Sequence, residues 1–105
     1  MPEFAVDLFS EDLPDASAQL VVRFTVERRR LVDYAVVLRV WDEGSWANVR
    51  LYDHAHGRPE MHRYTAGGSK MDSEAAPGAD VQEGFDAAKA QIRESWIEMI
   101  RAWRR

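Results

Sequence analysis

The sequence contains no cysteine among its 105 residues, which excludes disulfides, thiolate zinc sites and cysteine nucleophiles together. It also has no apolar run that approaches the roughly 20 residues needed to cross a bilayer. The first residues, Met1-Pro2-Glu3, carry an acid where a signal peptide carries basic side chains. We therefore expect a cytoplasmic protein that does not contact a membrane.

Positive charge is also scarce. The chain has 14 lysines and arginines against 18 aspartates and glutamates, a formal net charge of −4. That balance argues against unselective binding to nucleic acid through a global positive field, although it leaves room for a local basic patch. Hydrophobic residues make up 46% and charged residues 30% of the chain, as in an ordinary folded domain. The length predicts one domain.

The N-terminal segment, residues 1–17, is acidic and is interrupted by two prolines. Three larger apolar side chains alternate along it: Phe4, Val6 and Leu8. This alternation is a weak strand signal, so we expect the segment to be partly ordered or to form an edge strand. A single α+β domain is expected to follow it, over residues 18–105.

Alternating apolar and polar residues predict strands over residues 19–28, 31–41 and 46–53, and a shorter strand over residues 60–65. The links between the first three are only a few residues long. Parallel pairing would need a long crossover, so these links favour an antiparallel meander.

A helix is predicted from about Val81 to Trp103, because apolar residues recur there at steps of three and four. Asp80 is a suitable N-cap, with Glu83 three residues later. Such a helix is about 35 Å long, whereas a strand of about seven residues spans about 23 Å. Its end therefore overhangs the sheet or packs on another element. The predicted fold is an α+β meander of four or five antiparallel strands, with this one long C-terminal helix packed on one face.

All three histidines fall in the short stretch of residues 50–64. His54, His56 and His62, with Asp53 beside them, offer imidazole and carboxylate ligands that suit zinc or another transition metal. The alternative is a polar hairpin tip whose histidines are solvated or hydrogen-bonded. The spacing is not a recognised metal signature, and a one-residue slip in register would send the histidines to opposite faces. We expect no metal and no other cofactor.

The same histidines suit acid–base chemistry without a metal, because a histidine titrates near neutral pH. Arg50 and Arg63 are suited to holding a phosphate group. Together these five residues form a candidate catalytic set for RNA cleavage by the ribose 2′-hydroxyl. Tyr52 and Tyr64 are candidates for stacking a base or placing a hydroxyl. The alternative is that Arg50 and Tyr52 simply line the solvent face of the sheet.

A second candidate surface is the sheet face that the helix leaves open. If alternation is unbroken, that face carries aromatic and basic side chains together: Arg39, Trp41, Trp46, Arg50 and Tyr52. This mixture is typical of protein interfaces and also of surfaces that stack single-stranded nucleic acid. We expect a homodimer that uses this face; a solvated face with scattered apolar residues is the alternative.

The run Arg50-Leu51-Tyr52-Asp53-His54-Ala55-His56-Gly57, followed by His62-Arg63, resembles a motif of small bacterial domains of the TumE-like toxin type and of related small bacterial domains of unknown function. The resemblance extends over roughly residues 20–103. It implies site residues at these positions: Arg50, Tyr52, Asp53, His54, His56, His62 and Arg63. It also implies a toxin–antitoxin setting, with a cognate antitoxin protein as partner and RNA or translation as target.

Three hypotheses about function follow. The first is a toxin-like domain whose histidine and arginine hairpin acts on RNA without a metal. The second is a non-catalytic, homodimeric interaction or ligand-binding module that uses the aromatic and arginine face. A metal-dependent site ranks third.

Overall fold

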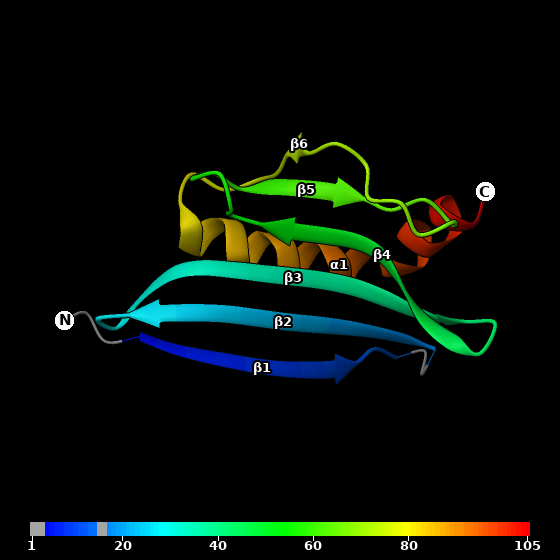
Figure 1. Cartoon of the computed structure of the whole chain (residues 1–105), viewed down its shortest axis with the longest axis horizontal. Helices are drawn as coiled ribbons and strands as arrows, with labels where there is room; N and C mark the ends of the chain where they lie inside the picture. Colours follow the sequence, from blue (N-terminus) through cyan, green and yellow to red (C-terminus); the bar gives the residue numbers. More distant parts are fainter. Residues whose placement is uncertain (1–3, 15–16) are drawn as a thin grey trace.

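The computed structural model describes residues 4–14 and 17–105 and shows one antiparallel sheet with a helix lying across it (Figure 1). The elements are β1 (Phe4–Asp12), β2 (Ala18–Glu27), β3 (Arg30–Asp42), β4 (Ser45–Asp53), β5 (Glu60–Arg63), β6 (Glu74–Ala75) and α1 (Val81–Arg104). Strand order across the sheet follows chain order. The α+β meander with one C-terminal helix is thus confirmed, with six strands in the sheet where four or five were expected.

The first added strand comes from the acidic N-terminal segment. β1 pairs with β2 along nine residues, from Phe4 opposite Glu27 to Asp12 opposite Gln19, without a register shift. Most of the segment is therefore an edge strand. Residues 1–3 and 15–16 of the same segment lie outside the described residues.

α1 begins where the sequence predicts. The Asp80 carboxylate accepts a hydrogen bond from the Glu83 amide at 2.9 Å, and the Glu83 carboxylate accepts one from the Ala79 amide at 2.8 Å. These two bonds satisfy amides that have no partner inside the helix. In the part of the chain that the structure describes, no helix is both long and apolar enough to cross a membrane.

The core lies between α1 and the sheet. Its largest fully buried side chains come from β2, β3, β4 and the middle of the helix: Leu20, Val22, Val36, Leu38, Val40, Tyr52 and Ile92. At its start α1 approaches the sheet very closely at Gly84. A β-carbon there would lie 2.5 Å from the Tyr34 hydroxyl and 2.8 Å from Pro59 Cγ. Only glycine fits this contact without displacing its neighbours.

One irregularity in β4 decides which side chains face the helix. Leu38 pairs with Arg50, and the next residue, Arg39, pairs with Asn48, so Val49 is an extra residue in β4. A bulge of this kind shifts the alternation of side chains by one. Arg50 and Tyr52 consequently turn toward α1. The prediction that these two share the open face with Trp46 is wrong, because it assumed unbroken alternation.

Candidate anion-binding site

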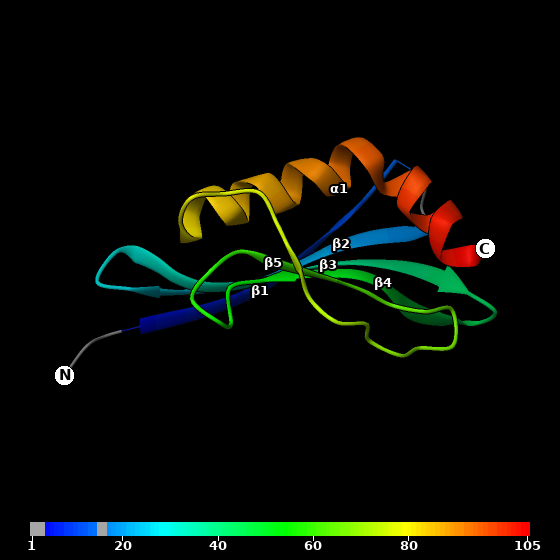
Figure 2. The ribbon, with the colours of Figure 1, turned by 90° about the horizontal axis from the view of Figure 1, so that it is seen from above.

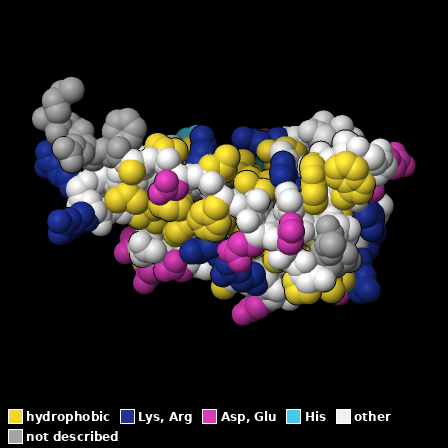
Figure 3. Space-filling model, turned by 90° about the horizontal axis from the view of Figure 1, so that it is seen from below, with side chains coloured by type: hydrophobic (Ala, Val, Ile, Leu, Met, Phe, Trp, Pro, Cys, Tyr) yellow, Lys and Arg dark blue, Asp and Glu magenta, His cyan; other side chains and the backbone are white. Residues whose placement is uncertain are grey.

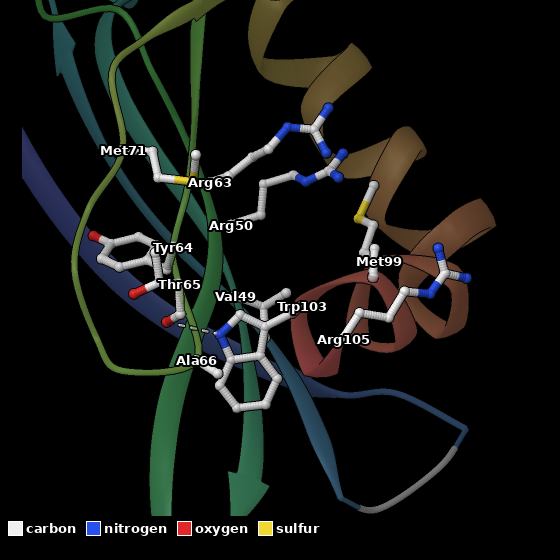
Figure 4. Close-up of a pocket in the computed structure, with 11 residues that line it drawn as sticks. Val49, Arg50, Arg63, Tyr64, Thr65, Ala66, Met71, Met99, Trp103 and Arg105 are labelled. Carbon is white, nitrogen blue, oxygen red and sulfur yellow. Dashed lines mark hydrogen bonds between the residues drawn. The ribbon is translucent and has the colours of Figure 1, made fainter.

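Arg50 and Arg63 are directly opposite each other on β4 and β5. Figure 4 shows their side chains extending side by side toward α1. With Arg105, at the C-cap of α1, they line a cavity of about 240 Å³. The sheet thus brings together the two arginines that the sequence marked for phosphate binding, and the helix end adds a third.

The rest of the cavity is largely apolar. Its wall toward the helix consists of Met99, Ala102 and Trp103, and the bulge residue Val49 contributes from the sheet. The guanidinium groups therefore share their cavity with side chains that lower the local dielectric, which strengthens electrostatic attraction to an anion.

Positive charge exceeds negative charge in this cavity. The Arg63 guanidinium donates from Nε to Glu74 at 2.8 Å. That hydrogen bond, together with the charges of Arg63 and Arg50, lowers the pKa of Glu74 below its ordinary value. In the described parts of the chain, neither Arg50 nor Arg105 forms an ion pair. Among the described residues that line the cavity, three carry a guanidinium and none a side-chain carboxylate; Glu74 lies outside the lining and offsets one of these charges through Arg63, which leaves an excess of two positive charges.

Tyr52 contacts Arg50 and does not line the cavity. Its side chain is only 1% exposed, and its hydroxyl donates to Gln91 Oε1 of α1 at 2.7 Å. The Arg50 guanidinium in turn donates from Nη1 to the Tyr52 hydroxyl at 3.5 Å. The prediction that Tyr52 stacks a base does not fit this burial, because the bulge places the ring in the core.

The last turn of α1 closes one side of the cavity. The indole of Trp103 donates from Nε1 to the Thr65 carbonyl at 3.1 Å, and Figure 2 shows the C-terminal end of the helix turned down toward the sheet. The helix is thus long enough to pack on the segment after β5. Arg105 thereby joins the site, although no motif in the sequence points to it.

The three histidines do not meet. The His54 ring packs beside Tyr34, with ring centroids 6.1 Å apart, whereas His62 is the cross-strand partner of Leu51, on the face turned away from α1. His56 lies in the turn between β4 and β5 and contacts Glu60. No histidine lines the arginine cavity. Over residues 4–14 and 17–105, no group of three or more potential ligands is placed to hold a metal ion.

The side chains of His62 and Asp53 lie close together on the sheet face turned away from α1. His62 Nδ1 hydrogen-bonds the Met71 carbonyl at 3.0 Å, and its Nε2 lies 3.9 Å from Asp53 Oδ2. His62 is only 8% exposed. These contacts tie the loop after β5 to the sheet, so the geometry gives His62 a structural role.

Glu60 is a buried carboxylate, 3% exposed. It accepts hydrogen bonds from the His56 imidazole and, at 3.0 Å, from the Ser73 hydroxyl, and Arg58 lies 3.5 Å away. The hydrogen bond from His56 is the largest cause that lowers the Glu60 pKa from its ordinary value of 4.5, and the bond from Ser73 is the next. Burial opposes this shift without cancelling it.

The lowered pKa predicts a pH-dependent contribution to stability. Glu60 stabilises the fold above pH 4.5, where its carboxylate is ionised in both states, and this contribution is lost as pH falls through the folded-state pKa. In urea unfolding, the free energy of unfolding of wild type should clearly exceed that of Glu60→Gln at about pH 7. The difference should be much smaller at about pH 3. The difference in free energy of unfolding between wild type and Ser73→Ala should also decrease toward low pH, but by less. A gap that stays constant over this range would contradict the assignment.

The aromatic cluster predicted for the open face is present in part. The rings of Trp41 and Trp46 meet edge to face at 5.4 Å, and the Arg39 guanidinium lies 5.2 Å from the Trp46 ring centroid. Trp41 is 48% exposed. Tyr64 is half-buried and lines both the arginine cavity and a neighbouring hollow beside Trp46.

Comparison with known proteins assigns the chain to a family without assigning an activity. No curated protein and no solved structure matches it. The comparisons give no support for membership of the TumE-like toxins. The sequence profile of one family, described as "Domain of unknown function (DUF7718)", matches residues 2–105. Because that match covers almost the whole sequence, the chain belongs to the DUF7718 family.

Proposed function

We propose that this protein binds a phosphate monoester in the cavity lined by Arg50, Arg63 and Arg105. The observation that carries the proposal is that three guanidiniums line a cavity of about 240 Å³ and that none of its described lining residues carries a side-chain carboxylate, although Glu74 pairs with Arg63 beside it. Guanidinium groups form paired, charge-assisted hydrogen bonds with phosphate oxygens, and Arg50 and Arg63 extend in parallel from adjacent strands.

The charge balance selects the kind of phosphate. A phosphate monoester carries about −1.5 to −2 charges near pH 7, which matches the excess of two positive charges around the cavity. A phosphodiester in a nucleic-acid backbone carries only one charge. The apolar wall of Met99 and Trp103 favours a ligand with a planar or apolar group beside its phosphate. A 5′-phosphorylated RNA end meets both requirements and agrees with the RNA target that the sequence suggests.

The proposal is for binding, without a chemical step. A general base must come within about 2.6–3.2 Å of the proton that it removes, directly or through one water. His54, His56 and His62 all lie outside the cavity, so their arrangement lends no support to RNA cleavage at the arginines. Of the candidate catalytic residues, Arg50 and Arg63 keep a role here as ligands of the phosphate.

Two short RNA oligonucleotides of identical sequence, one with a 5′-phosphate and one with a 5′-hydroxyl, test the proposal by isothermal titration calorimetry. The phosphorylated RNA is expected to bind at least about tenfold more tightly, since a hydrogen bond to a charged group contributes about 1.5–3 kcal/mol. Arg50→Gln should remove most of that preference. Equal affinity for the two oligonucleotides would refute the proposal.

Arg30→Gln is the matched control. Arg30 is exposed at the start of β3, beside the turn that joins it to β2, and does not line the cavity. Its replacement removes the same charge as Arg50→Gln but should leave the preference for the 5′-phosphate unchanged. If both variants lose the preference equally, diffuse charge rather than the cavity accounts for binding. Unchanged melting temperatures would show that both variants remain folded.

A further inference from the structure

β1 forms one outer edge of the sheet, and within the described chain no strand pairs with its free side. Natural proteins protect such an edge with charged side chains, above all lysine, or with proline, a bulge, a very short strand or a covering element. β1 is nine residues long, contains neither lysine nor proline, and pairs with β2 without a bulge. Its backbone is therefore open to pairing with another chain.

The side chains of β1 differ between its two faces. Val6 and Leu8 lie on the face turned away from α1 and are 54% and 72% exposed. Asp7 and Glu11 lie on the α1 side, since their cross-strand partners, Phe24 and Leu20, contribute to the helix-facing core. The side turned away from α1 thus presents Val6 and Leu8, with Asp12 at its end, and the other side presents Asp7 and Glu11 on either side of the 42%-exposed Phe9.

Every charged residue of β1 is acidic: Asp7, Glu11 and Asp12. Arg93 of α1 pairs with Glu11, which leaves two carboxylates without a cationic partner among the described residues. Figure 3 looks onto this edge and shows hydrophobic side chains with acidic groups beside them. Pairing with a second copy would bring six carboxylates to one seam, and like charges on adjacent strands destabilise a sheet.

We propose that β1 accepts an extended segment of another protein in which lysine or arginine alternates with apolar residues. Main-chain hydrogen bonds would add this segment to the sheet as a further strand. Its apolar side chains would pack beside Val6 and Leu8, and its basic side chains would face Asp7 and Glu11. This edge lies across the sheet from β5 and the arginine cavity, so the inference stands apart from the proposed phosphate site.

A synthetic peptide that alternates lysine with valine, nine residues long to match β1, is the probe. Fluorescence anisotropy measures its affinity, and hydrogen exchange locates it. We expect binding that slows exchange of β1 amides. A glutamate–valine peptide of the same length should bind at least about tenfold more weakly, because its charges repel those of the strand. Equal binding of the two peptides, binding of neither, or protection located elsewhere would overturn the proposal.

Leu8→Lys tests the edge from the protein side. The side chain is exposed, so the substitution should leave the melting temperature unchanged while it weakens binding of the lysine–valine peptide at least about tenfold. Ile97→Lys makes the same change at a 47%-exposed position of α1 and should have no effect. Undiminished binding to Leu8→Lys would overturn the proposal. So would a dimer, detected by sedimentation, that Leu8→Lys dissociates, because the edge would then belong to a second copy.

Discussion

Replacing Ile92 with alanine is expected to destabilise the fold by about 2–5 kcal/mol, the range for removing a large aliphatic side chain from a packed core. Ile92 is fully buried in α1. Alanine removes three carbons there and leaves a cavity between the helix and the sheet. The higher helix propensity of alanine returns well under 1 kcal/mol. Urea unfolding monitored by tryptophan fluorescence measures the difference.

Ile97→Ala provides the matched control on the same helix. Ile97 is 47% exposed, so the same chemical change opens no enclosed cavity. Its effect should stay within about 0.5–1 kcal/mol, as for most surface substitutions. If both variants lost equal stability, the core would not lie along the face of α1 that carries Ile92.

Gly84→Ala should destabilise the protein by about 1–3 kcal/mol, as expected for added bulk in a tightly packed contact. In an ordinary helix the same change would gain roughly 1 kcal/mol from helix propensity. Here the new methyl group would meet the Tyr34 hydroxyl at 2.5 Å and Pro59 at 2.8 Å. The start of α1 would have to move away from the sheet. A shift in thermal midpoint, measured by circular dichroism, gives the sign of the effect.

Gly67→Ala is the corresponding control. A β-carbon at Gly67 would have only the Thr65 hydroxyl within reach, at 3.8 Å, an ordinary contact distance. This substitution should change stability by no more than about 0.5 kcal/mol. A stabilised Gly84→Ala variant would mean that the helix start moves at little cost, and that helix propensity outweighs packing there.

Local pattern predicts most of this fold. The alternation from Ala18 to Val22 and from Tyr34 to Val40 reflects one buried face, and α1 starts at the N-cap that Asp80 and Glu83 indicate. The number of strands is harder to predict. The two-residue β6 has no periodicity to detect and forms because Glu60 and Met61 offer it a free edge.

The candidate site was predictable only in part, because it depends on one extra residue. Arg50 and Arg63 are recognisable as phosphate ligands from their chemistry, and they do meet. Their orientation toward α1 requires the bulge at Val49, which no local pattern in β4 indicates. Arg105 joins them because the last turn of α1 packs on the sheet, with Trp103 buried and hydrogen-bonded to Thr65. That contact links distant parts of the chain, and sequence periodicity carries no information about it.

The chain-order arrangement of the strands also has a consequence for synthesis on the ribosome. Each strand from β2 to β5 can pair with its predecessor as soon as it emerges, but α1 follows all of them. At the usual rate of about 5–20 residues per second, the 24 residues of α1 take roughly one to five seconds to make. Throughout that interval the nascent sheet presents its helix-facing row, centred on Val22, Val36 and Leu38, to the surroundings. We therefore expect this apolar face to be open to chaperone binding until the helix is complete.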